Sequence, residues 1–187
     1  MNKLLQIVLS ACLFIAILFF LQFFQESLIY SKEAVNAGEL WRLWTGHLVH
    51  INYKHLLLNC IGLGIFIVLY NKALSLKMLI IESCILASSI SIGLYYLSAN
   101  IFLYAGLSGL LYGLFTLYSI KAIKLKDYLL GYCVFFLISL KIIWSYIDPA
   151  INVKSSLLIQ APIANDVHLY GYITAIVIAT VMMIMDY

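Results

Sequence analysis

The sequence predicts an all-α membrane protein with six transmembrane helices, for three reasons. Of its 187 residues, 65% are hydrophobic and 10% are charged, and the mean hydropathy is +1.05. Soluble domains carry about 45–50% apolar and about 25% charged residues. The apolar residues also fall into runs near the length of about 20 residues that spans a bilayer. We therefore exclude a water-soluble or disordered chain and expect one membrane domain over residues 1–187.

The expected helices follow one another along the whole chain. Their ranges are about 4–24, 53–70, 76–97, 104–122, 128–147 and 165–185. The first range includes a stretch ending at Cys12 that resembles a lipoprotein cleavage box, but apolar residues continue through Phe24. A signal peptide ends near its cleavage site, so we expect a retained helix.

The distribution of Lys and Arg predicts the orientation. If the N-terminus is inside, the inner segments carry six basic residues, which are Lys3, Lys72, Lys77, Lys121, Lys124 and Lys126. The outer segments carry four, which are Lys32, Arg42, Lys54 and Lys154. Cytoplasmic loops hold the excess, so we expect both termini in the cytoplasm and the long connections 25–52 and 148–164 outside. The net charge of +3 is spread along the chain, so we expect a lipid bilayer and no nucleic acid as partner.

The four cysteines give no sign of a metal site or a disulfide framework. Each lies inside an apolar run, and the spacings match no zinc motif; they are Cys12, Cys60, Cys84 and Cys133. We expect them to be small buried hydrophobic residues. No metal and no cofactor is expected.

Polar side chains gather at the start of the second, fourth and sixth expected helices. These side chains are His47, His50, His55 and Asn59 in GHLVHINYKHLLLN, Ser108 in LYAGLSGLLYGLF, and His168 in NDVHLYGYITA. All three helices begin on the outer side, and a rise of about 1.5 Å per residue puts these residues at similar depth. Because polar groups are costly in a bilayer, this arrangement predicts one cavity open to the outer side.

Ser108 and His168 predict nucleophilic catalysis in this cavity. A serine hydroxyl needs a base to take its proton, and histidine is the usual base. The backbone N–H groups in the first turn of the fourth helix can stabilise an oxyanion, with His50 and Asn59 as further donors. Asp166 lies two residues before His168 and on another helical face, so we expect a dyad without an acidic third member.

Small residues predict that the fourth and sixth helices pack closely. Gly106 and Gly109 relieve crowding around the serine, Gly113 follows four residues after Gly109, and Gly171 and Ala175 are four apart. Small residues at this spacing let membrane helices approach each other. This approach would bring the serine and the histidine within hydrogen-bond distance.

Other polar residues have structural interpretations. We expect His55 to tie the first outer connection to the bundle and His47 to lie at the membrane interface. Glu82 and Lys141 lie inside apolar runs, and we expect both to be interfacial. Lys141, near the outer end of the fifth helix, is also placed to meet a substrate.

Together these residues resemble the rhomboid family of intramembrane serine proteases. The matching features are the Trp41-Arg42 pair, the segment with His50, His55 and Asn59, the GLSG motif at 106–109 followed by Tyr112, and His168-x-x-Gly171. The short chain and the string WRLWTGHLVHINYKHLLLN look most like the rhombosortase subgroup. That subgroup is associated with bacterial proteins that end in a glycine-glycine pair, an apolar helix and a basic tail.

The resemblance implies a function and a role for each residue. Ser108 would be the nucleophile, His168 the general base, and His50 and Asn59 would line the oxyanion site. Tyr112 would pack against the His168 ring, and 128–147 with the connection after it would form a substrate gate and cap. The enzyme would cleave single-span membrane proteins near the outer face of the bacterial inner membrane. In one departure from the family pattern, Tyr170 and Tyr172 flank Gly171 in place of smaller residues.

Two other functions stay open at this point. A non-catalytic rhomboid relative would bind membrane helices without cutting them, but such proteins typically lack the serine or the histidine. A haem- or metal-binding membrane protein would use His50, His55 and His168, although the sequence has no HExxH motif. A small transporter is disfavoured because the sequence shows no internal repeat.

Overall fold

The computed structural model of the protein describes residues 2–160 and 163–185 and shows a helical bundle. The long helices are α1 (Lys3–Leu21), α5 (Tyr53–Tyr70), α6 (Leu76–Tyr96), α7 (Ser108–Lys124), α8 (Tyr128–Ile147) and α10 (Asn165–Ile184). In the described part of the chain, five of these are long and apolar enough to cross a membrane, and α7, with 17 residues, is shorter. The predicted all-α membrane bundle is therefore confirmed.

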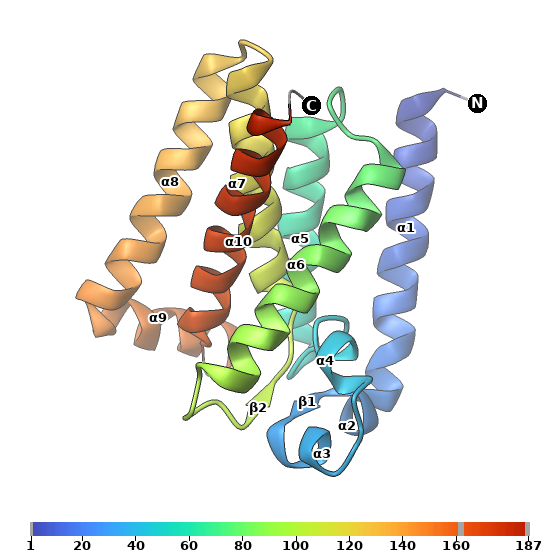
Figure 1. Cartoon of the computed structure of the whole chain (residues 1–187). Coiled ribbons are helices and arrows are strands. Elements are labelled where there is room, and N and C mark those ends of the chain that lie inside the picture. Colours follow the sequence, from blue (N-terminus) through green and yellow to red (C-terminus); the bar gives the residue numbers. More distant parts are fainter. Residues whose placement is uncertain (1, 161–162, 186–187) are drawn as a thin grey trace.

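The helices alternate in direction, as the predicted order requires. The start of α1 and the end of α10 lie at one end of the bundle, and α5, α7 and α10 begin at the opposite end (Figure 1). The polar starts of these three helices therefore lie at the same level.

The first long connection folds into short elements at the end where α5, α7 and α10 begin. These elements are η1 (Gln22–Phe24), α2 (Gln25–Leu28), β1 (Tyr30–Ser31), α3 (Lys32–Asn36) and α4 (Arg42–Thr45). The Arg42 guanidinium holds them together, because it donates to the carbonyls of Glu26 and Ile29 at 2.9 and 2.8 Å and pairs with Glu39 at 2.6 Å. A guanidinium with several fixed donors suits this role.

The fourth expected helix begins later than predicted. Strand β2 (Leu103–Tyr104) pairs antiparallel with β1, and α7 starts only at Ser108. Gly106 has φ +138°, which L residues rarely adopt, so the chain turns here instead of continuing as a helix. The expected range 104–122 included Tyr104 and Gly106, but both residues lie before the observed helix α7.

Two expectations about buried and exposed residues were wrong. Cys12, Cys84 and Cys133 are exposed, because in a membrane bundle the apolar face also points outward to lipid. Glu82 is buried, not interfacial, and it forms an ion pair with Lys121 of α7. A carboxylate inside an apolar bundle needs such a partner, and the partner lies on a different helix.

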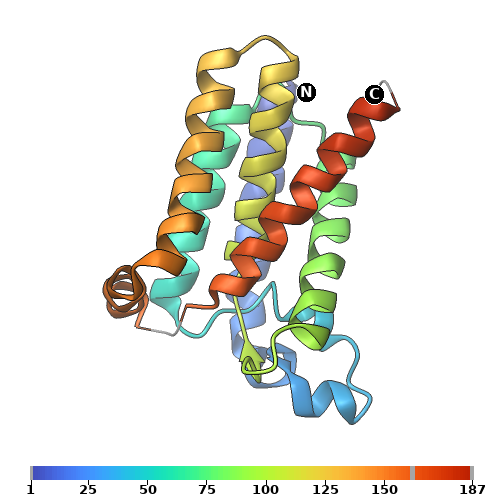
Figure 2. The same cartoon turned by 60° about the vertical axis from the view of Figure 1, so that its left-hand side comes forward.

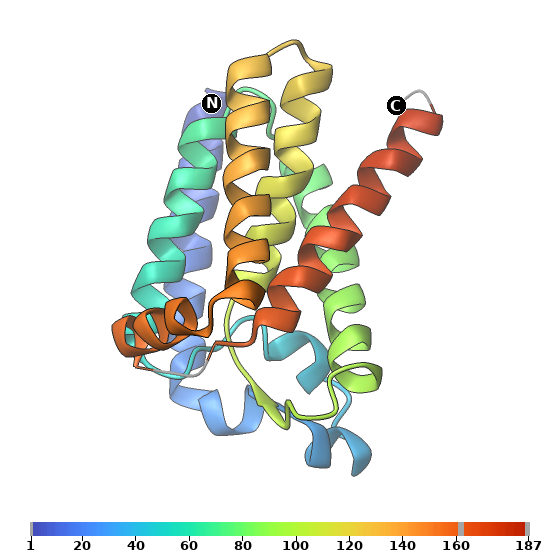
Figure 3. The same cartoon turned by 90° about the vertical axis from the view of Figure 1, so that its left-hand side faces the viewer.

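Glycines bring α7 and α10 into backbone contact. A Cβ atom on Gly171 would overlap the carbonyl oxygen of Gly109 and lie 3.3 Å from the Gly113 nitrogen. The two helices cross near the end where both begin and then diverge (Figures 2 and 3). The close approach predicted from the glycine spacing is therefore present.

The tyrosines beside Gly171 do not prevent this contact, because both point to other helices. The Tyr170 ring packs on Gly93 of α6, and its hydroxyl lies 2.9 Å from Ser98 Oγ. The Tyr172 hydroxyl lies 2.8 Å from Ser139 Oγ of α8. The departure from the family pattern thus adds contacts between α10 and its other neighbours.

We predict that Gly171→Ala destabilises the protein by roughly 1–3 kcal/mol, because the added methyl group must displace backbone and not a flexible side chain. Gly64→Ala is the matched control, since a Cβ there would meet no atom within 4 Å. Thermal unfolding in detergent micelles measures both. Equal unfolding temperatures for the two variants would contradict the proposed contact.

Candidate active site

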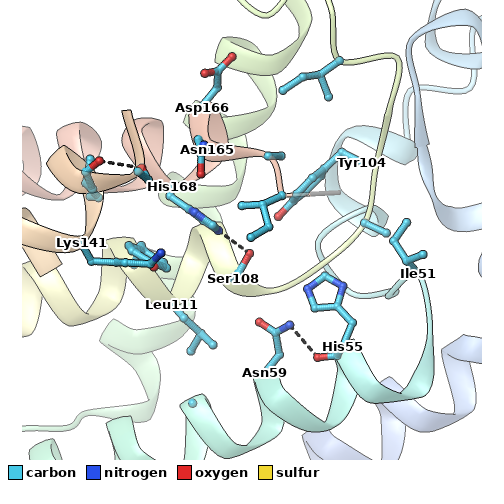
Figure 4. Close-up of a pocket in the computed structure, with 18 of the residues that line it drawn as sticks. Ile51, His55, Asn59, Tyr104, Ser108, Leu111, Lys141, Asn165, Asp166 and His168 are labelled. Atoms are coloured by element: carbon cyan, nitrogen blue, oxygen red, sulfur yellow. Dashed lines mark hydrogen bonds between the residues drawn. The ribbon is translucent and has the colours of Figure 1, made fainter. Parts of the chain in front are cut away.

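Ser108 and His168 lie within hydrogen-bond distance of each other. The Ser108 Oγ and His168 Nε2 atoms are 2.9 Å apart, although 60 residues separate them in the sequence (Figure 4). Ser108 opens α7 and His168 lies in the first turn of α10, so the glycine contact between these helices sets the distance. Both side chains are half-buried, which leaves them reachable from a cavity.

The His168 ring is held by an aromatic neighbour. The Tyr112 ring stacks on it with a centroid separation of 4.2 Å and an interplanar angle of 14°. Tyr112 is four residues after Ser108 on the same helix, so α7 places both the hydroxyl and the surface that orients the imidazole.

Asp166 faces away from this pair. Its two carboxylate oxygens accept hydrogen bonds from the Ser98 hydroxyl at 2.9 Å and the Tyr146 hydroxyl at 3.1 Å. These partners belong to the segment after α6 and to α8. The carboxylate therefore joins the start of α10 to α8 and to the segment after α6, and it does not contact His168 as a third member of the dyad.

A cavity of about 840 Å³ opens beside the serine and the histidine. Its polar lining includes Ser108, His168, His55, Asn59 and Lys141. One N–H of the Asn59 side-chain amide donates to the His55 carbonyl at 3.0 Å (Figure 4). The same amide carries a second N–H that can donate to another acceptor. Because α5, α7, α8 and α10 all contribute to the wall, the cavity lies in the middle of the bundle end.

His50 is buried against the backbone that precedes Ser108. Among the described residues that line the cavity, His55 is present and His50 is not. His50 is fully buried, and its Nε2 accepts the backbone N–H of Leu107 at 3.3 Å. This hydrogen bond supports the backbone before Ser108 and puts the proton of the neutral ring on Nδ1. The His50 ring meets the edge of the His55 ring at a centroid separation of 5.1 Å.

Burial keeps the His50 imidazole neutral. Loss of hydration and, second, the neighbouring His55 lower the pKa of His50 to about 3. The neutral ring is the form that can accept from Leu107. His50 thus helps to fix the loop that carries the serine.

His47 is buried and not interfacial as we expected. Its Nε2 lies 2.9 Å from Ser91 Oγ of α6, and burial lowers the pKa of His47 to about 4. The sequence could not reveal this partner, because it lies 44 residues away. His47 joins the first connection to α6.

Tyr104 was missed as a residue of the site. It lines the cavity, and its hydroxyl donates to the carbonyl of Gly106. Burial raises the pKa of Tyr104, so the phenol stays a neutral donor. The position of Tyr104 just before the GLSG motif could have indicated its role, but the helix expected over 104–122 included this residue.

A comparison with protein-family models identifies the chain. The model described as the rhomboid domain matches residues 37–184, which include every residue of the site described above. The protein belongs to the rhomboid family. Rhomboids are intramembrane serine proteases that act on transmembrane substrates within the bilayer. No curated protein matches the chain.

Helix α8, the expected gate, and Ile163 and Ala164 at the end of the expected cap line the cavity of this rhomboid. Helix α8 lines one wall, and α9 (Pro149–Ile159), which we expected to be a loop, lies across the same end (Figure 1). The Asn52 amide at the start of α5 donates to the Gln160 carbonyl at 3.3 Å. Within the described ranges, no three His, Cys, Asp or Glu side chains converge as metal ligands.

We predict that the stability of the His50→Gln variant falls less with decreasing pH than the stability of the parent rhomboid. A histidine has a pKa near 6.5 when unfolded, whereas burial holds His50 at about 3. Its contribution to stability is present above pH 6.5 and is lost as the pH falls toward 3, at up to about 1.4 kcal/mol per pH unit. Unfolding temperatures between pH 7 and 5 should fall less in the variant than in the parent.

The control is Lys54→Gln, which changes an exposed residue at the start of α5. It should retain the pH dependence of the parent. An unchanged pH slope in His50→Gln would contradict the neutral, buried state of this ring.

Proposed function

We propose that this rhomboid is an active endopeptidase that cuts single-span membrane proteins with a Ser108–His168 dyad. The observation that carries the proposal is the 2.9 Å separation of Ser108 Oγ and His168 Nε2 at the wall of a cavity. A non-catalytic relative would not need this pair. The resemblance to the rhombosortase subgroup favours substrates with a C-terminal glycine-glycine sorting signal.

The dyad supports a two-step hydrolysis. The Ser108 Oγ attacks the scissile carbonyl carbon while its proton passes to His168 Nε2. Collapse of the tetrahedral intermediate breaks the C–N bond, and His168 returns the proton to the leaving amine. Water then attacks the acyl-enzyme, with His168 again as base, and releases the carboxylic acid and the free serine.

Two groups of hydrogen-bond donors would stabilise the oxyanion. The first turn of α7 begins at Ser108, and its backbone N–H groups have no preceding helical carbonyl. The Asn59 amide, across the cavity on α5, offers a second N–H. Fixed donors of this kind stabilise the developing charge without reorganisation.

We place the enzyme in the bacterial inner membrane with both termini in the cytoplasm. The charge distribution supports this orientation, because the chain-end side carries Lys3, Lys72, Lys77 and the three lysines from 121 to 126. Cleavage then occurs near the outer face. Helix α8 would admit the substrate from the lipid, and α9 in the connection after it would cover the bound substrate.

We predict that Ser108→Ala and His168→Ala each lower cleavage of a single-span reporter by roughly 10³-fold or more, since the two groups act as a unit. A fluorophosphonate probe should label the parent but not Ser108→Ala. The matched control is Ser119→Ala, which removes a buried hydroxyl that donates to the Thr116 carbonyl within the same helix. Full cleavage by either dyad variant would reject the proposal.

We predict that Asn59→Ala lowers kcat by roughly 10²- to 10³-fold with little change in KM, as expected for loss of an oxyanion donor. Asn71→Ala is the control, because Asn71 makes the same kind of local bond, to the Val68 carbonyl at 2.7 Å, at the far end of α5. Kinetics with a reporter in proteoliposomes measure both. An unchanged kcat in Asn59→Ala would remove this residue from the proposed site.

A further inference from the structure

A lysine projects into the cavity from the helix opposite the dyad. Lys141 belongs to α8, and its side chain reaches into the space beside Ser108 and His168 (Figure 4). The residue is half-buried and lies about 9 Å from the end of α8, since it is six positions before Ile147. It is therefore set into the membrane-spanning part of the wall and not at its rim.

Lys141 has no anionic partner among the residues that the structure describes. The two ion pairs found there join Arg42 to Glu39 and Lys121 to Glu82. The carboxylate that shares the cavity, Asp166, accepts instead from the Ser98 and Tyr146 hydroxyls. The contrast with Lys121 is informative, because that lysine is also half-buried but is paired with a carboxylate.

A substrate that fills the cavity changes the surroundings of Lys141. It removes water from an ammonium group that has no counter-ion, and burying an unpaired charge is costly. A neutral substrate segment at this position leaves that cost in place. A carboxylate at the same position offsets it with a charge-assisted hydrogen bond.

The reaction adds a second reason for an anion at this position. Lys141 is close enough to the His168 ring for its charge to act on it. When Ser108 attacks, His168 becomes an imidazolium, and two positive groups then face the same cavity. A carboxylate next to Lys141 lowers this repulsion in the transition state, so it favours kcat as well as binding.

We propose that Lys141 is a specificity-determining residue that pairs with an acidic side chain, Asp or Glu, of the substrate near the bond that is cut. This inference rests on the proposed protease function and names the substrate chemistry at that site. The sequence suggested an interfacial role or contact with a substrate for Lys141, and this proposal gives the second interpretation a specific chemistry. The cavity would thus select an acidic residue within an otherwise apolar membrane segment.

The test uses a single-span reporter that the parent cuts, with its cleavage site mapped by mass spectrometry. Aspartate is placed at each position within two helical turns of that site, and a matched Asn reporter is made for each one. Cleavage is measured in vesicles of zwitterionic phosphatidylcholine. At one or two neighbouring positions, we expect kcat/KM to be roughly 10- to 100-fold higher for Asp than for Asn, as for a hydrogen bond to a charged group.

Variants of Lys141 decide the source of this preference. Lys141→Gln should erase it, Lys141→Arg should keep it, and Lys141→Glu should favour a reporter with Lys at the same position. Lys77→Gln, an exposed charge change at the start of α6, should behave as the parent. Retention of the Asp preference in Lys141→Gln, or an equal loss for Asp and Asn reporters, would overturn the inference.

The design separates this inference from the proposed function. If the parent cuts no reporter and Ser108→Ala changes nothing, both fail. If the parent cuts in a Ser108-dependent way but does not distinguish Asp from Asn at any position, only the role of Lys141 fails.

Discussion

The contact between Gly171 and the backbones of Gly109 and Gly113 is the constraint on which the site depends. Ser108 and His168 lie on different helices, and neither helix alone can fix the distance between them. In a bilayer, helices gain little from burying apolar groups against each other, so close packing of small residues supplies the attraction. The crossing lies within the first turns of α7 and α10, where the hydroxyl and the imidazole are placed.

A second set of contacts fixes where α7 begins. The β1–β2 pair, the hydrogen bond from the Gly106 nitrogen to the Gly46 carbonyl at 3.0 Å and the bond from Leu107 to His50 hold the backbone just before Ser108. A Cβ on Gly106 would lie 2.7 Å from the His55 ring, so the loop and the cavity wall fit only with glycine. The helix therefore starts at the serine, and its first-turn N–H groups face the cavity end.

Much of this arrangement could be predicted from single residues and their spacing. The helix ranges followed from apolar runs, and the grouping of Ser108, His168 and Asn59 followed from their depth. The place of His55 in the cavity lining could not be predicted, because His50 lies just before α5 and His55 in its first turn. Only the path of the loop before α5 decides which ring faces the cavity. The burial of His47 and Glu82 was missed for a related reason: their partners, Ser91 and Lys121, come from other helices.

The most direct measurement is an experimental structure of the protein after reaction with a fluorophosphonate. We predict a bond between the phosphorus and Ser108 Oγ, with His168 beside it. The phosphoryl oxygen should lie within hydrogen-bond distance of the Asn59 amide and the first N–H groups of α7. Phosphorus bonded to a different residue, or a phosphoryl oxygen turned away from both groups of donors, would contradict the proposed site.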